Sequence, residues 1–336
     1  SAIVKPQDYF NTKLYTGNAS SSRDITGVGF QPDFTWIKDR DGTFSHILGN
    51  AVSGDNKFLS SNGTAAESTD STKFRTFVSD GFQVGNHNGV NANSNDYASW
   101  NWLAGASQTL NSGNVTSTVR ANTTAGFSIV KWTGTADNIL VSHGLGVIPK
   151  VVMIKNLSNG SAQWVVYHVG TGNTKACYLN TTATPTTASG FFNNFTPDAT
   201  NFIVGSDTAV NGSGNSMIAY CFADVQGYSK FSSYTGNGSA DGSFIYTGFK
   251  PAFVMMKCTD LARSWQMHNN KSDPFNSVTR RLFANLSDAE VSNTDLDFLS
   301  NGFKVRTTDL NMNGSGNNYI YMAFAENPLV ANSGTD

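Results

Sequence analysis

The residues that could carry out catalysis are few and far apart in this chain. Hydrolysis of a glycosidic bond needs two carboxyl groups about 5 to 9 Å apart, which two acids separated by two or four residues on one strand would provide. Glu67, Glu290 and Glu326 are isolated, and the nearest acidic pair is Asp295 and Asp297. We interpret that pair as decorating a loop or a strand edge, so we expect no catalytic residues.

The metal-binding and nucleophilic residue types show no functional spacing either. The three cysteines form no CxxC pair, which argues against a disulfide framework and a zinc site. The segment Asp39–Gly42 resembles the opening of a calcium loop, but it is truncated and lacks the distal Glu, and a hairpin turn explains it. Neither a GxSxG elbow nor a phosphate-binding glycine loop occurs. We therefore expect no metal and no cofactor.

The histidines fit a structural role better than acid–base chemistry. None of the five forms a His-x-His or His-Glu-x-x-His motif. His46, His168 and His268 fall in comparable regions of three repeated segments, and each follows an aromatic residue. We interpret each of these segments as a strand whose aromatic residue anchors the core and whose histidine ends it.

Two segments could instead bind a ligand or a partner. The segment GNHNGVNANSND, residues 85–96, offers Asn88, Asn93 and Asp96, which are groups that sugar-binding loops use. A long hairpin turn has the same composition, and we favour that interpretation. Phe191 and Phe192 form an apolar cluster that, if exposed, would indicate a protein interface.

The elements that position these residues are defined by an internal repeat. The strand-like block Gly29–Lys38 recurs at shifts of 117 and 102 residues. Three other blocks also recur, and all four keep the same order in each repeat. The repeated blocks are 29–38, 146–155 and 248–257; 15–17, 132–134 and 234–236; 82–84, 202–204 and 303–305, followed by Asn91, Asn211 and Asn311; and 100–102, 220–222 and 322–324. The repeat makes Trp36, Met153 and Met255 equivalent and predicts that they share one environment.

The sequence of each repeat predicts a layered β structure. Its first block is a proline followed by apolar residues on both faces and a lysine, which predicts a strand buried on both sides. Short alternating runs separated by Gly, Asn, Asp and Ser are typical of a β-sandwich. We expect an all-β protein of three tandem sandwiches with about eight strands each: residues 1–107; 108–228, with a linker and an extra strand near 115–119; and 229–330, with a tail at 331–336.

Composition and charge exclude several classes of function. Charged residues make up 14% of the chain, below the roughly 25% of typical soluble domains, and the net charge is −2. The scattered Lys and Arg residues give no basic surface for nucleic acid. No apolar run approaches the ~18 residues of a membrane span, and the first ten residues lack the pattern of an export signal.

The repeated blocks resemble a known family, the tandem concanavalin-like jelly-roll domains of virion structural and tail-fibre-like proteins of cyanophages and other marine bacteriophages. The resemblance spans almost the whole chain. The motifs that carry it are YTGN at 15–18 and 234–237, GFQPDF at 29–34, SDGF at 79–82, AYCFA at 219–223 and MAFAE at 322–326.

The resemblance implies a non-enzymatic virion component on a fibre, tail or capsid surface, produced in the host cytoplasm. Its partners would be other virion subunits and a host-surface glycan or protein. The alternatives are a fibre-shaft or capsid-decoration protein without a receptor, and a polysaccharide depolymerase. A homotrimer and an internal pseudo-threefold arrangement are both compatible with three repeats.

Overall fold

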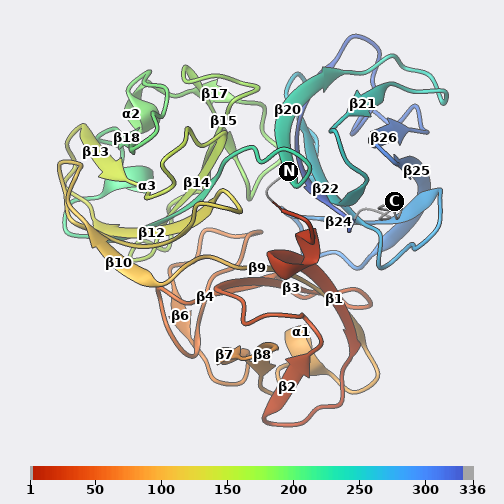
Figure 1. The fold of residues 1–336 in the computed structure, drawn as a ribbon, viewed down its shortest axis with the longest axis horizontal. Coiled ribbons are helices and arrows are strands. Elements are labelled where there is room, and N and C mark those ends of the chain that lie inside the picture. Colours follow the sequence, from red (N-terminus) through yellow and green to blue (C-terminus); the bar gives the residue numbers. More distant parts are fainter. Residues whose placement is uncertain (1–2, 328–336) are drawn as a thin grey trace, which may run out of the picture.

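The computed structural model describes residues 3–327 and is all-β, as predicted. Three lobes surround a common centre and follow one another along the chain (Figure 1). Each lobe corresponds to one sequence repeat, and we call them units one, two and three. The predicted tail at 331–336 lies outside the described residues.

Unit one contains the short helix η1 and nine strands. Its elements are η1 (Pro6–Asp8), β1 (Phe10–Thr16), β2 (Arg23–Thr26), β3 (Phe34–Asp39), β4 (Ile47–Asn50), β5 (Lys57–Phe58), β6 (Ser68–Thr69), β7 (Phe74–Val78), β8 (Gly81–Val84), α1 (Asn88–Asn91) and β9 (Asp96–Trp102).

Unit two contains ten strands. Its elements are β10 (Ser107–Leu110), β11 (Ser117–Asn122), β12 (Phe127–Thr133), β13 (Ile139–Ser142), β14 (Val151–Asn156), β15 (Val165–His168), β16 (Lys175–Tyr178), β17 (Thr186–Thr187), α2 (Ser189–Phe192), β18 (Asn201–Val204), α3 (Thr208–Asn211) and β19 (Ser216–Phe222). The expected linker is thus largely a hairpin, because β10 and β11 extend the sheet of β12.

Unit three contains eight strands. They are β20 (Ser229–Thr235), β21 (Phe244–Tyr246), β22 (Pro251–Cys258), β23 (Gln266–Asn269), β24 (Val278–Phe283), β25 (Val291–Leu299), β26 (Gly302–Val305) and β27 (Asn318–Ala325). Within residues 3–327, no helix is long and apolar enough to cross a membrane.

The three units repeat one antiparallel strand order at the centre of the molecule. The order β1-β9-β3-β4 recurs as β12-β19-β14-β15 and as β20-β27-β22-β23. The register repeats too: Trp36 pairs with Trp100, Met153 with Tyr220, and Met255 with Met322. All six side chains belong to one hydrophobic cluster, so the predicted equivalence of Trp36, Met153 and Met255 is confirmed.

The strands β3, β14 and β22 are buried on both faces, as their sequences predict. Successive side chains point to opposite faces of a strand. In β14, Val151 and Met153 therefore face the centre of the molecule, while Val152 and Ile154 face the interior of unit two. Each unit has its own interior, and all three share the central cluster.

The shared cluster brings together equivalent aromatic rings from the three units. Trp102, Phe222 and Phe324 occupy the same register position, opposite Phe34, Val151 and Phe253. Their ring centroids lie 5.7, 6.0 and 6.2 Å apart. The sequence predicts a core for each unit but not this fourth, common one.

A ring of hydrogen bonds also joins neighbouring units. Trp164 Nε1 in unit two donates to Ser60 O in unit one at 3.0 Å, and Trp265 Nε1 in unit three donates to Tyr178 O in unit two at 2.9 Å. His46 Nε2 in unit one lies 2.9 Å from Phe283 O in unit three. The register of β4, β15 and β23 makes His46, Trp164 and Trp265 equivalent.

Two details of the predicted alignment are wrong. Of the three histidines expected to end a strand, His168 does so, whereas His46 precedes β4 and His268 lies within β23. The residue equivalent to Asn91 and Asn211 is Asn313 rather than Asn311. All three side-chain oxygens accept a hydrogen bond from the turn after the first central strand of their unit, at 2.9 to 3.0 Å.

Candidate functional site

The predicted loop residues of unit one lie on a crossover connection. The segment 85–96 connects β8 to β9, which lie in different sheets, so it is a crossover containing α1 rather than a hairpin turn. Asn88 and Asn93 are exposed, while the carboxylate of Asp96 accepts a 2.7 Å hydrogen bond from Thr16. These residues lie in a different lobe from Phe191 and Phe192 (Figure 1).

Phe191 and Phe192 do not form an exposed apolar patch. Phe192 is 3% exposed and packs into the interior of unit two, with its ring 5.8 Å from that of Tyr167. Phe191 is half-buried and lies edge-to-face with Tyr178 at 6.1 Å. The sequence indicates apolar side chains here but not that helix α2 turns one of them inward.

The acidic pair Asp295 and Asp297 lies in strand β25, which pairs with β24 and β26 on its two sides, rather than in a loop or at a strand edge as expected. Asp295 is fully buried and lies 3.4 Å from Arg281, while Asp297 pairs with Arg306 at 3.2 Å. Glu290 forms a bidentate ion pair with Arg40 of unit one at 2.8 and 3.0 Å. These carboxylates are therefore held in structural interactions.

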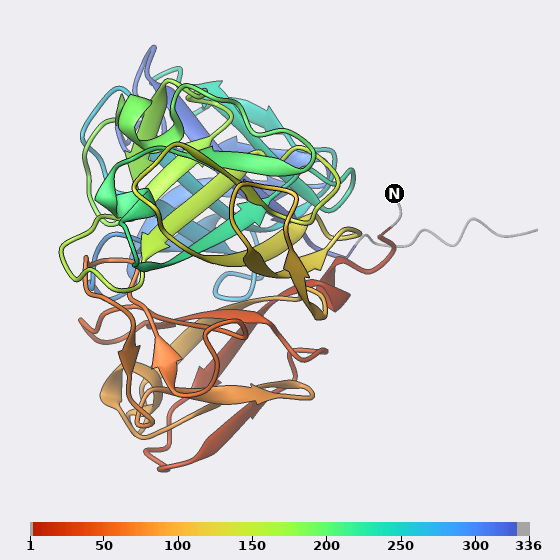
Figure 2. The same cartoon turned by 90° about the vertical axis from the view of Figure 1, so that its left-hand side faces the viewer.

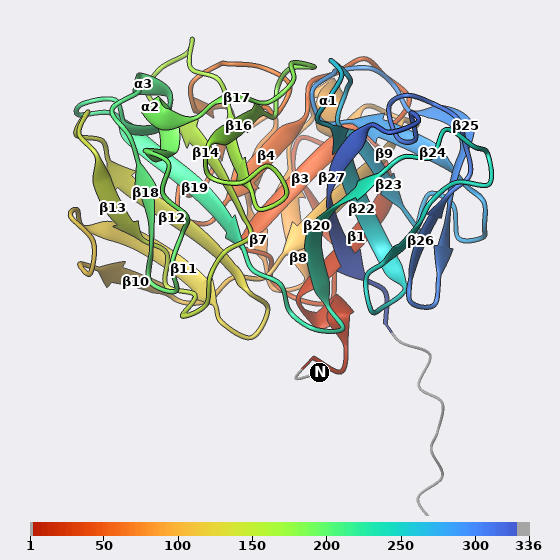
Figure 3. The same ribbon diagram turned by 90° about the horizontal axis from the view of Figure 1, so that it is seen from above.

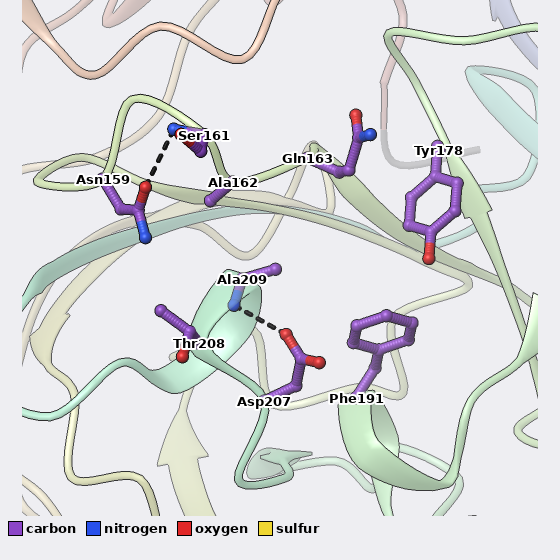
Figure 4. A pocket seen from close by; sticks show the side chains of 9 residues that line it. All are labelled: Asn159, Ser161, Ala162, Gln163, Tyr178, Phe191, Asp207, Thr208 and Ala209. Carbon is purple, nitrogen blue, oxygen red and sulfur yellow. Dashed lines mark hydrogen bonds between the residues drawn. The ribbon is translucent and has the colours of Figure 1, made fainter.

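A pocket does occur in unit two, between the β14–β15 loop and helices α2 and α3. Its volume is about 280 Å³, close to the lower end of the ~300–1,000 Å³ range for small-molecule sites. The residues that line it are Asn159, Ser161, Ala162, Gln163, Tyr178, Phe191, Asp207, Thr208 and Ala209 (Figure 4). Of the predicted site residues, Phe191 alone lies at this pocket.

The pocket exists because unit two has a small residue where unit one has a large one. Counting back two residues from the equivalent His46 and Trp164 makes Phe44 the counterpart of Ala162. The Phe44 ring lies 6.1 Å edge-to-face from His87, and its Cβ would be 3.4 Å from a Cβ built on Gly89. Phe44 thus fills the groove beside α1, whereas Ala162 leaves the groove beside α3 open.

A buried lysine shapes one wall of the pocket. Lys155 is fully buried at the end of β14 and donates from Nζ to Ala162 O at 2.9 Å and to Asn159 O at 3.4 Å. It also donates to Thr64 O of unit one at 2.8 Å. Burial lowers the pKa of Lys155 to about 8. This lysine positions the loop and ties it to the neighbouring unit.

The opposite wall is formed where α2 meets the turn that leads into α3. The backbone N–H of Gly205 donates to Phe191 O at 2.7 Å, and that of Asp207 donates to Gly190 O at 3.1 Å. A Cβ on Gly205 would lie 2.2 Å from Gly190 O, so only glycine permits this close approach. These contacts place the Phe191 ring beside the Asp207 carboxylate (Figure 4).

The pocket carries one carboxylate and no basic side chain. Asp207 caps α3 by accepting from Ala209 N–H at 2.8 Å through Oδ1. Within residues 3–327, no hydrogen bond or ion pair engages its Oδ2. Burial, with a smaller contribution from the negative charge of Asp207, raises the pKa of Tyr178 above its usual value. The site is therefore acidic and aromatic.

The equivalent carboxylate in unit three is neutralised within the chain. Asp309 accepts from Asn311 N–H at 2.9 Å, as a cap, and pairs with Arg281 at 2.8 Å. The register of β16 and β24 places Ala176 of unit two at the position of Arg281. Asp207 therefore has no counterpart of the Arg281 side chain.

A second hollow lies between units two and three, with a volume of about 410 Å³. No aromatic side chain lines it, and its acid, Asp260, already accepts hydrogen bonds from Asn318 N and Nδ2 at 2.7 and 3.1 Å. Compared with this second hollow, the unit-two pocket offers a ligand aromatic rings as well as polar groups.

The replacement of Phe44 by Ala162 is a sequence signal for this pocket, but it can be recognised only once the strand register has aligned the two units. One additional residue separates Lys155 from Trp164 compared with Lys38 and His46, so a fixed shift of 117 residues does not align Phe44 with Ala162. Counting back from the end of the loop, at His46 and Trp164, does align them. Asp207 and Tyr178 have no sequence neighbour that marks them as site residues.

The fold and site define an all-β protein of three repeated units with an open, acidic, aromatic-lined pocket in the second unit. A family model described as "Domain of unknown function (DUF7483)" matches residues 5–328, and the chain belongs to that family. None of the curated proteins matches it.

Proposed function

We propose that this protein is a non-enzymatic module of a bacteriophage virion surface that attaches to host glycans through the pocket of unit two. In this proposal the three units are jelly-roll domains of a tail fibre or surface fibre. The virion assignment rests on the sequence resemblance. The glycan assignment rests on the pocket.

The chemistry of the pocket supports a saccharide ligand. Sugars present hydroxyl groups for polar side chains and an apolar ring face for aromatic ones. Asn159, Ser161 and Gln163 supply polar groups on one side, and Tyr178 and Phe191 supply rings on the other (Figure 4). The volume suits a ligand of about one sugar ring.

The position of the pocket supports attachment. Helices α2 and α3 lie at the end of the molecule opposite η1 (Figure 3), and the side view shows unit one below units two and three, which overlap in that view (Figure 2). The shared cluster and the inter-unit hydrogen bonds make the pocket part of a well-connected body. A preorganised site loses less free energy to ordering on binding.

A glycan array probed with the full chain and with Ala162→Phe tests this proposal. The substitution places the side chain of unit one into the unit-two groove, and we expect the array signal to fall at least tenfold while the melting temperature stays within a few degrees. Asn88→Ala, on the exposed crossover of unit one, is the control and should leave the signal unchanged.

Three results would contradict the proposal. An array signal that survives Ala162→Phe would place the glycan site elsewhere, and the absence of any signal would favour a shaft or decoration role without a receptor. Release of reducing ends from host envelope polysaccharide would contradict the non-enzymatic assignment.

A further inference from the structure

We infer that the unit-two pocket selects ligands that carry an organic ammonium group, with Asp207 as the counter-ion and Tyr178 and Phe191 as aromatic walls. This inference rests on the proposed function and specifies the ligand class of the same site. An amino sugar with a free amine is the source that agrees with a glycan ligand.

The Asp207 carboxylate is exposed, and no cation from residues 3–327 pairs with it. Asp207 Oδ1 is used by the cap of α3, while Oδ2 stays open toward the pocket, and no Lys or Arg side chain lines it. In unit three the chain supplies the cation itself, since Arg281 pairs with Asp309 at 2.8 Å. Unit two has Ala176 at the position of Arg281, fully buried in the interior of the unit, so this position supplies no cation to Asp207.

The aromatic side chains suit the same group. An ammonium is attracted to the face of an aromatic ring within about 6 Å of its centroid, and the rings of Tyr178 and Phe191 lie 6.1 Å apart at an interplanar angle of 83°. The edge-to-face arrangement presents a ring face and a ring edge to the same space. A cation between these rings and Asp207 would contact groups of complementary charge on more than one side.

The polar wall would recognise the remainder of the ligand. The Asn159 side-chain oxygen is used by Ser161 N–H at 2.8 Å, and the Gln163 side-chain oxygen accepts from Asn180. Both residues therefore present their amide N–H groups, and within residues 3–327 no hydrogen bond engages these. These amide N–H groups can donate hydrogen bonds to the hydroxyl oxygens of a sugar ring.

Calorimetry of the full chain with glucosamine and N-acetylglucosamine tests the inference, because the two sugars differ in the charge at one nitrogen. We expect glucosamine to bind about tenfold more tightly, the combined size of an exposed ion pair and a cation–π contact. Asp207→Asn keeps the cap, since asparagine caps helices as well as aspartate, and should abolish the preference. Asp137→Asn, an exposed acid of unit two away from the pocket, is the control and should retain it.

The outcomes separate the two levels of the proposal. Equal affinity for both sugars, blocked by Ala162→Phe, would overturn the ammonium inference and leave glycan binding intact. Binding of neither sugar, with an array signal insensitive to Ala162→Phe, would overturn both. Choline is the third probe: binding as tight as that of glucosamine, lost in Asp207→Asn, would support ammonium recognition but assign the source to a quaternary headgroup and count against a glycan.

Discussion

Units one and two have the same central strand order and differ at the groove beside their short helices. In unit one, Phe44 covers His87 and Gly89. In unit two, Ala162 leaves Asp207 and Ala209 facing a cavity of about 280 Å³. The size of one side chain therefore distinguishes the filled groove from the open one, although helix α2, which forms a wall of the open groove, has no counterpart helix in unit one.

Unit three differs from unit two at the carboxylate equivalent to Asp207. Its carboxylate, Asp309, pairs with Arg281, which also lies 3.4 Å from the buried Asp295. Units one and two have Phe58 and Ala176 at the position of Arg281. The repeat thus has a phenylalanine, a buried alanine and an ion-paired arginine at one register position.

The largest expected effect comes from the junction that holds the unit-two loop. Trp164 is fully buried in the shared cluster, and replacing it with alanine should lower the free energy of unfolding by about 3–5 kcal/mol, measured by urea denaturation. Trp164→Phe keeps most of the ring and loses the bond to Ser60 O, so its loss should be smaller. Equal losses would show that the hydrogen bond, rather than packing, dominates this junction.

The ionic cluster of unit three should make its stability depend on pH. Burial raises the pKa of Asp295 to about 7, despite the opposing charge of Arg281. The unfolded chain releases this proton near pH 4, while the folded chain keeps it to about pH 7. The stabilising contribution of the protonated group is therefore lost as the pH rises between these values.

Asp295→Asn tests this dependence because asparagine cannot ionise. The stability of the variant relative to the natural chain should rise from pH 4 to pH 7 by at most about 4 kcal/mol, given 1.4 kcal/mol for each unit of pKa difference. Burial lowers the pKa of His268 to about 3, which acts in the opposite direction but is present in both proteins. A difference that stays flat over this range would show that Asp295 is ionised in the folded state.

The smallest of the three effects is expected for a substitution that gives unit one the small side chain found in unit two. Phe44 is half-buried, so Phe44→Ala should cost about 2 kcal/mol, less than a fully buried phenylalanine. The substitution should open a second groove, visible in a crystal structure, without creating a second ammonium site, because His87 stands where unit two has Asp207. A groove that closes by collapse of α1 would show that more than one side chain separates the two units.

Much of the framework could be predicted because it depends on local patterns. The proline, the continuous apolar run and the lysine of 146–155 specify a strand buried on both faces, and the three copies specify that it occurs once in each unit. Phe192 and Asp295 were predicted less well. Residue type indicates that a side chain is apolar or acidic, but the direction in which it points depends on the turn of α2 or the register of β25.

The sequence by itself determined an all-β chain with three copies of one strand plan, because alternation and repetition are properties of neighbouring residues. Tertiary structure alone decided that Trp102, Phe222 and Phe324 meet at one centre, that Lys155 reaches across to Thr64, and that the groove at Ala162 is open. These features join residues distant in the chain, and their geometry follows from how the sheets pack. The packing of the sheets cannot be predicted from the local composition of the sequence.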